Sequence, residues 1–275
     1  MAKVSKEAKQ LYSDKISEYK RSLEETTKKI NQMKLILQRD DSGASYKRML
    51  IADETMSLVA LYCIMNRLSV DLLGIKNEFF INEARKSCYE SLILLEAVFS
   101  DLVNVPFSEL KDNFEDISTY PVESKYHLLK KLGFSITMVK DAFGENSKWK
   151  MSFIDLEARH AVISNNSIDF KNIIKELDPR ERELFALHIN FIEMTIRALN
   201  DSANNYRLKY ELTTLKMDDF KKAILLLATL KRLYSYIGKK KEAEEIQKKI
   251  DVWKAKLQSD MANQEKKSKE ERRNP

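Results

Sequence analysis

The sequence predicts an all-α protein, an elongated multi-helix bundle, and three observations support this prediction. Only 5 Gly and 4 Pro occur among 275 residues, whereas sheets, phosphate-binding loops and catalytic turns usually need both residue types. Apolar residues recur at helical spacing along most of the chain, and strand-like alternation is missing. Hydrophobic residues make up 43% and charged residues 33%, which is typical of amphipathic helices. We therefore expect about eight or nine helices in two layers.

Residues 1–104 are expected to form a three-helix layer with a long first helix. This helix, from about Lys6 to Arg39, has an apolar seam made of Tyr12, Ile16, Tyr19, Leu23, Ile30, Met33 and Leu37. Such a seam either docks along another helix of the chain or forms a coiled coil. Docking within the bundle is favoured, because the next segment is apolar.

The second and third helices complete this layer. The second, from about Ser45 to Leu73, is apolar on more than one face and therefore belongs in the middle of the bundle. Gly74 is expected to end it, because glycine readily adopts the left-handed conformation found after helices. The third helix, from about Asn77 to Val103, carries one apolar stripe. Short loops between helices of similar length indicate an up-down-up arrangement.

Residues 105–120 are expected to connect two domains, because they lack a sustained apolar period and are bounded by prolines. A C-terminal helical domain is then expected over residues 121–258. Its first helix begins at Pro121, since proline suits the first helical turn, and ends at Gly144.

Further helices are expected over about residues 147–163 and 168–177. The run Asp178-Pro179-Arg180-Glu181 is a start signal for the next helix, with Asp at the N-cap and Glu two residues after Pro. That helix either breaks in the polar segment after Leu199 or continues to Leu215.

The last two helices are expected from Asp218 to Gly238 and from about Lys239 to Leu257. The final helix has a polar outer face and an apolar seam, which is typical of a helix that covers the end of a helical stack; the seam consists of Ala243, Ile246, Ile250, Trp253 and Leu257. Residues 259–275 are expected to form a disordered charged tail, because they contain too few apolar side chains to offset the entropy of ordering.

Within the last helix pair, the spacing Leu227-x2-Leu230-x3-Tyr234-x3-Gly238-x4-Ala243 resembles the second half of a tetratricopeptide repeat. The resemblance implies a helical hairpin in which the tyrosine fills the face of the first helix. The glycine then makes the turn, and the small alanine lets the second helix approach. The resemblance covers a single repeat, and its second helix has Gln247 where the family has an aromatic residue.

The sequence contains no catalytic motif. It has no Gly-rich phosphate-binding loop, no Cys-x-x-Cys and no Gly-x-Ser-x-Gly. Glu157 and His160 have the spacing of a di-iron ligand pair, but such a site needs a second Glu-x-x-His. None occurs at His127 or His188, so we interpret Glu157 and His160 as a surface pair and the other histidines as packing or interface residues. We therefore expect a protein that is not an enzyme, with no catalytic residue, no cofactor and no metal.

Cysteine content and charge restrict the remaining classes. Cys63 and Cys88 are too few for a disulfide framework. We interpret them as buried thiols, and a disulfide between them could form only in an oxidising compartment. The net charge is +6, with the surplus at both ends of the chain. Acidic residues alternate with the basic ones there, so nucleic-acid binding is not expected. Trp149, between Lys148 and Lys150, lies at helical spacing with apolar residues, which favours core packing over base stacking.

These observations predict a non-enzymatic interaction or scaffold module that binds a partner helix or filament along a groove between helices, with exposed aromatic residues as anchors. A structural subunit of a bacterial envelope, filament or motility assembly is the alternative, and a basic nucleic-acid-associated protein is the second. No apolar stretch reaches the ~20 residues of a membrane span. The start MAKVSKEAKQ is polar, so we expect a cytoplasmic protein, or a periplasmic one if a signal peptide was removed. The sequence leaves open the partner, its binding residues and the oligomeric state.

Overall fold

The computed structural model describes residues 4–145, 147–176, 180 and 182–273. It is 86% helical, and the residues in these ranges form no strand, which confirms the all-α prediction. The chain divides into two compact units. Unit 1 comprises Met1–Asp101 with Leu110–Ile163, and unit 2 comprises Leu102–Glu109 with Ser164–Pro275.

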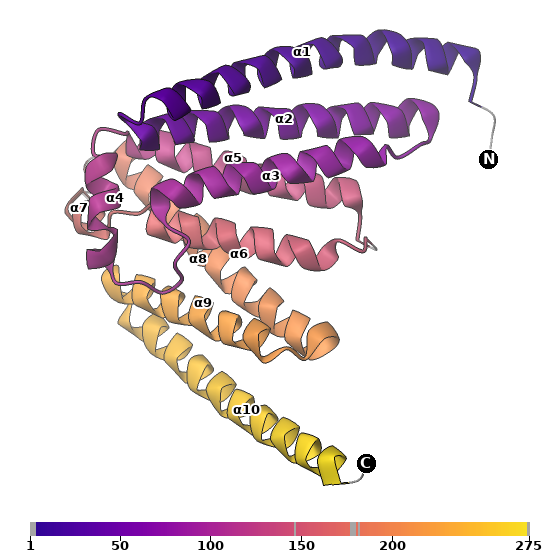
Figure 1. Ribbon diagram of the computed structural model, residues 1–275. Helices are drawn as coiled ribbons and strands as arrows, with labels where there is room; N and C mark the ends of the chain where they lie inside the picture. Colours follow the sequence, from indigo (N-terminus) through magenta and orange to yellow (C-terminus); the bar gives the residue numbers. More distant parts are fainter. Residues whose placement is uncertain (1–3, 146, 177–179, 181, 274–275) are drawn as a thin grey trace. The chain divides into compact units, whose positions relative to one another are not determined.

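Unit 1 is built on three long helices that lie side by side (Figure 1). These are α1 (Lys6–Arg39), α2 (Ala44–Leu73) and α3 (Glu78–Phe99). Helix α5 (Val122–Phe143) packs against both α2 and α3. The short η1 (Phe107–Leu110) and α4 (Lys111–Asp116) precede α5, and α6 (Lys150–Asn166) follows it.

The apolar seam of α1 docks on α2 within the chain, as predicted. Ile16 packs in one buried cluster with Met65 and Phe80, and Ile30 packs in a second with Ile51 and Leu58. The other seam residues are partly buried against these clusters; they are Tyr12, Tyr19, Leu23, Met33 and Leu37. The seam is therefore used for packing inside unit 1.

Helix α2 is the central helix of unit 1. It is long and apolar enough to cross a membrane by length and composition, but here it packs against α1, α3 and α5. Buried side chains occur on several of its faces, among them Ile51, Val59 and Met65. The helix ends at Gly74, whose φ of 67° lies in the left-handed region, as expected for a glycine after a helix.

Helix α6 is joined to α3 by a polar clamp. The guanidinium of Arg159 donates two hydrogen bonds of 2.6 Å to the carboxylate of Glu96, and the Arg159 guanidinium also lies over the ring of Tyr89. Bidentate pairs of this kind fix orientation as well as distance. The clamp holds the register between these two helices.

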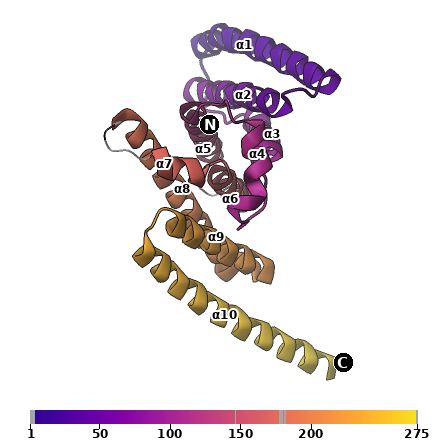
Figure 2. The same cartoon turned by 90° about the vertical axis from the view of Figure 1, so that its left-hand side faces the viewer.

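Unit 2 contains α7 (Phe170–Glu176), α8 (Arg182–Lys209), α9 (Met217–Tyr236) and α10 (Lys240–Arg273). A π-helical turn, η2 (Tyr210–Thr214), ends α8. Figure 2 shows α10 beside α9; the two form a hairpin whose turn contains Gly238 with a φ of 75°. Ile250 and Trp253 of the predicted α10 seam are buried.

The structure divides the chain differently from the expected connector at 105–120. That segment contains η1 and α4, and the following helix α5 returns to unit 1. The local change in composition identified a turn region, but it could not show which apolar face the next helix would cover. The predicted helix start at residues 178–181 falls mainly outside the described residues.

Helix α10 also extends further than expected, because it continues through most of the predicted disordered tail to Arg273. The phenol of Tyr210 donates to Asp260, and the amide of Gln264 donates to the carbonyl of Leu215. The Lys256–Asp260 pair, four residues apart, supports the helix locally. These polar contacts hold the extension as far as Gln264.

The central position of α2 leads to a stability prediction. Met65 is fully buried, so Met65→Ala should lower the free energy of unfolding by about 2–5 kcal/mol through loss of contacts and a residual cavity. Ile64→Ala, next to it on the partly exposed face, should cost less than about 1 kcal/mol. Urea unfolding monitored by circular dichroism measures both. Equal losses would contradict the assignment of the buried face.

Candidate functional site

The three histidines have different surroundings. His127 is exposed, 3.7 Å from Glu123 on the same helix, and His188 is buried on α8. Glu157 pairs with Lys140 at 2.5 Å. Among the described residues, no group of three or more His, Cys, Asp or Glu side chains could hold a metal ion.

His160 is buried, so its interpretation as part of a surface pair is wrong. Its Nε2 lies 2.9 Å from the carbonyl oxygen of Leu129 on α5. A Cβ added to Gly133 would lie 3.1 Å from the imidazole, so the glycine leaves the room that the ring occupies. Burial lowers the pKa of His160, against the opposing effect of the hydrogen bond to Leu129. His160 is therefore a neutral packing residue at neutral pH.

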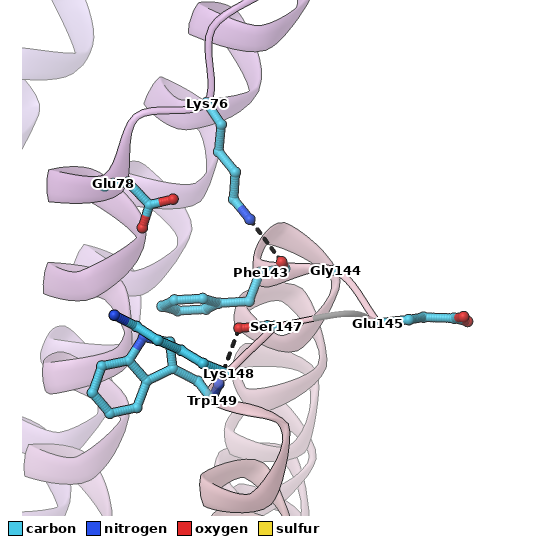
Figure 3. Close-up of a pocket in the computed structure, with 8 residues that line it drawn as sticks. All are labelled: Lys76, Glu78, Phe143, Gly144, Glu145, Ser147, Lys148 and Trp149. Atoms are coloured by element: carbon cyan, nitrogen blue, oxygen red, sulfur yellow. Dashed lines mark hydrogen bonds between the residues drawn. The ribbon is translucent and has the colours of Figure 1, made fainter.

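The candidate site is a hollow between two helix-to-helix turns of unit 1, which we call the turn pocket (Figure 3). Its volume is about 680 Å³, within the range of ~300–1,000 Å³ common for ligand sites. The α2–α3 turn and the start of α3 contribute two residues, and the end of α5 and the α5–α6 turn contribute six; together these are Lys76, Glu78, Phe143, Gly144, Glu145, Ser147, Lys148 and Trp149.

The α2–α3 turn is held by asparagine side chains. The backbone N–H of Asn77 donates to the side-chain oxygen of the buried Asn66, at 2.9 Å. The oxygen of Asn77 in turn accepts the N–H of Phe80 and caps α3. Because Asn77 is fixed from both sides, Lys76 and Glu78 beside it are held in place.

The α5–α6 turn depends on a glycine and a serine. Gly144 has a φ of 78°, and its N–H donates to the carbonyls of Lys140 and Asp141. The hydroxyl oxygen of Ser147 accepts the N–H of Trp149 at 3.2 Å. Lys76 joins the two turns, since its ammonium donates to the carbonyl of Phe143 at 2.6 Å.

Two aromatic rings line the pocket. Phe143 is buried, with the ammonium of Lys76 5.6 Å from its ring centre. Trp149 is half-buried, and the guanidinium of Arg85 lies 3.9 Å from its ring centre. Cations this close to an aromatic face are attracted by the ring quadrupole. These contacts restrict the motion of both rings.

Charged groups of both signs surround these rings. Lys148 lies over Trp149, 5.6 Å from the ring centre, whereas Glu145 points away from both rings (Figure 3). Within the part of the chain that the structure describes, no ion pair is formed by Lys148, Glu78 or Glu145. The pocket can therefore offer both a cation and a carboxylate to a ligand.

Exposed apolar side chains occur next to the lining residues. Phe79 follows Glu78 and is 63% exposed, and Ile75 precedes Lys76 and is also exposed. Exposed apolar side chains that neighbour pocket-lining residues in the sequence are candidates for contact with another molecule. The arrangement offers apolar contact, hydrogen bonding and charge to a ligand.

The comparisons with known proteins define a family. Residues 8–261 match the TP0443 family, so the chain belongs to the TP0443 family. No curated protein and no solved structure matches the chain.

Sequence reasoning located only part of this site. Trp149 attracted notice, but it lines the turn pocket instead of lying in the core. Lys76, Glu78 and Phe79 were missed, because their roles depend on the contact between the α2–α3 and α5–α6 turns. Gly74 and Gly144 each predicted the end of a helix, but nothing in the sequence indicated that the two turns lie together.

The two cysteines are free thiols, and both are buried. Burial raises the pKa of Cys63 to about 11. Burial also raises the pKa of Cys88, and the nearby Cys63 adds to the effect. Because the thiolate is the reactive form, both should be unreactive in the folded protein.

The neutral state of His160 predicts a pH dependence of stability. The unfolded imidazole binds a proton as the pH falls below its ordinary pKa near 6.5, whereas the folded one resists protonation. The free energy of unfolding should therefore decrease as the pH is lowered from 7.5 to 5.5, because the unfolded state takes up a proton that the folded state resists. Urea unfolding of wild type and His160→Gln measures this, and the variant should lose part of the pH dependence.

His127→Gln is the matched control, because it replaces an exposed histidine of α5 and leaves the buried His160 in place. If His160→Gln and wild type show the same slope against pH, then His160 is not held neutral by the fold.

The buried thiols predict slow chemical modification. Ellman's reagent at pH 8 should react with Cys63 and Cys88 much more slowly in native protein than in guanidinium, where two thiols per chain should react fully. Rapid reaction of either thiol in native protein would contradict its burial.

Proposed function

We propose that this protein is a non-enzymatic interaction module that binds a helical segment of a partner protein at the turn pocket. The single observation that carries the proposal is the turn pocket walled by Phe143 and Trp149, whose lining residue Glu78 is followed in the sequence by Phe79, which is 63% exposed. Aromatic anchors beside well-formed pockets dominate the energy of protein interfaces.

The energetic argument starts from the exposed apolar area. Covering an exposed phenylalanine removes apolar surface from water, which is worth about 1.5–3 kcal/mol for full burial. Ile75 adds to the same surface. A partner that covers both side chains gains this energy without requiring unit 1 to unfold or repack.

Preorganisation supports the same proposal. Asn66, Gly144 and Ser147 hold the two turns through hydrogen bonds, and Lys76 joins them. A surface that is already ordered loses little conformational entropy on binding. The turn pocket therefore suits a binding site that keeps its shape.

The charges support a partner segment with both signs. Lys148 and Glu78 lie on the pocket lining, and opposite charges on a partner would orient it and exclude wrong registers. A nucleic acid offers only negative charge and would meet Glu78 unfavourably. The α9–α10 hairpin, through its tetratricopeptide resemblance, adds support for an interaction role. The free thiols favour a cytoplasmic location.

A photo-cross-linking experiment tests this function. A benzophenone amino acid at position 79, introduced in the native cell, should yield a covalent adduct with a partner protein after irradiation. The same amino acid at Ile93 is the matched control, because Ile93 is 58% exposed on the same helix, ~21 Å further along α3.

Adduct formation at position 79 should disappear when Lys148→Glu is added, since that change reverses a charge at the pocket. Equal adducts at positions 79 and 93, or none at position 79, would contradict the proposed function.

A further inference from the structure

Arg85 of α3 is a cation that the fold holds without an acidic partner. Its guanidinium lies 3.9 Å from the ring centre of Trp149, which lines the turn pocket, and 5.9 Å from the ring centre of Tyr89. Among the described residues, no ion pair includes Arg85, and its buried Nε has no hydrogen-bond partner. A covered polar group without an acceptor costs free energy. Arg85 therefore lacks the acceptor that its position requires.

Arg159 shows the completed form of the same arrangement in unit 1. It lies 5.6 Å from the ring centre of Tyr89 and donates two hydrogen bonds to the carboxylate of Glu96. Arg85 has the aromatic half of this arrangement, because the rings of Tyr89 and Trp149 lie beside it, but it has no carboxylate. The comparison indicates that a carboxylate is the missing acceptor.

The edge of the Arg85 guanidinium is open to such an acceptor. Stacking on an aromatic ring uses the flat face of a guanidinium and leaves its N–H groups, which lie in the plane, free to donate. Nε is the only nitrogen of Arg85 that is buried without a partner, so the two terminal nitrogens reach the surface. A carboxylate that approaches them can accept two parallel hydrogen bonds.

The carboxylates on the same helix do not fill this position. Three of them already pair with other cations; the pairs are Glu83–Lys86, Glu90–Lys34 and Glu96–Arg159. Glu78 begins α3, about 10 Å along the helix axis from Arg85, and Glu145 of the facing turn points away from both pocket rings (Figure 3). An acceptor from another molecule is therefore needed to complete the arrangement.

Lysines of the α5–α6 turn add positive charge beside Arg85. Lys148 lies over the same Trp149 ring, 5.6 Å from its centre, and Lys150 follows Trp149 in the sequence; both lysines are exposed. The lining of the turn pocket has two lysines and two glutamates. Arg85 thus adds a positive charge that the lining does not balance, which favours an anionic group at this edge of the pocket.

We propose that the partner segment of the turn pocket carries an acidic side chain and that Arg85 receives its carboxylate; this inference rests on the proposed function. The terminal N–H groups of Arg85 donate to the carboxylate, and Lys148 adds a second positive charge at Trp149. Because a bidentate contact fixes orientation as well as distance, one aspartate or glutamate sets the register of the partner segment on the pocket.

The first experiment tests the anion site by itself, with sodium acetate as the carboxylate probe. Nuclear magnetic resonance follows the side-chain Nε–H signals of the nitrogen-15-labelled full chain, with sodium chloride holding the ionic strength constant. The signal of Arg85, assigned by its absence from Arg85→Lys, should shift in a saturable way. The signal of Arg159 should not move, because its guanidinium already pairs with Glu96.

Inorganic phosphate is titrated in parallel. The absence of a saturable shift of the Arg85 signal with acetate would overturn the site. A saturable shift with phosphate and none with acetate would show that the acceptor is a phosphoryl group and would also contradict the inference.

The second experiment separates binding from a structural role. Arg85→Gln should change the melting temperature little, because the guanidinium has no ion-pair partner to lose. Arg159→Gln should lower the melting temperature, since it leaves the largely buried carboxylate of Glu96 without its cation. An equal fall for both variants would show that Arg85 serves packing and would contradict the inference.

The third experiment uses the benzophenone amino acid at position 79 in the native cell. Arg85→Gln should reduce the adduct about tenfold, the loss expected when a hydrogen bond to a charged group is removed. Lys86→Gln is the matched control, because Lys86 is the next residue, is exposed and carries the same charge; the adduct should be unchanged.

The outcomes separate this inference from the proposed function. If position 79 yields an adduct that Arg85→Gln leaves intact, the inference fails and the proposed function stands. If acetate binds at Arg85 but position 79 yields no adduct, the proposed function fails, and with it the partner segment as the source of the carboxylate.

Discussion

The burial of α2 is the constraint on which unit 1 depends. Ile51, Val59 and Met65 are buried on this helix, and no single neighbouring helix could cover all its apolar faces. Helices α1, α3 and α5 share this task. An apolar helix surrounded in this way satisfies the same composition that would suit a lipid bilayer, because both environments remove its side chains from water. The helices that pack against α2, and not its composition, therefore decide that it lies in a protein core.

The turn pocket is a consequence of this packing. Once α3 and α5 lie against α2, the α2–α3 and α5–α6 turns meet closely enough for Lys76 to bond the carbonyl of Phe143. Asn66 is a polar residue inside the apolar helix, and its side chain fixes the backbone of the α2–α3 turn. The central helix of the unit thus also orders the surface beside it. Core and site are physically continuous.

The proposed binding surface of unit 1 lies where two helix-to-helix turns meet. Ile75 lies in the α2–α3 turn and Phe79 in the first turn of α3, and both side chains are exposed. In unit 2, Leu212 of the π-helical turn η2 is also exposed. A rigid turn presents few side chains, but it presents them in one conformation, which suits specific association more than broad adhesion.

Local pattern was sufficient for the helices themselves. The bounds of α1 and the end of α2 at Gly74 follow from apolar period and glycine position, because helix formation depends on residues three or four apart. The same logic anticipated the hairpin turn at Gly238 and the buried residues of α10. The same logic placed the boundary between domains at residues 105–120, unlike the two units of the structure. Local pattern could not show which apolar face α5 would cover. It also ended α10 too early, because the contacts of Asp260 and Gln264 come from residues about fifty positions away.

The sequence alone therefore determined that this protein is helical and where most helices begin and end. Tertiary structure alone decided that His160 is buried, that Trp149 faces a pocket, and that Phe79 and Leu212 remain exposed. The physical reason is that periodicity indicates which side of a helix is apolar, whereas burial depends on which other element packs against that side. A site formed by two turns about seventy residues apart has no local signature.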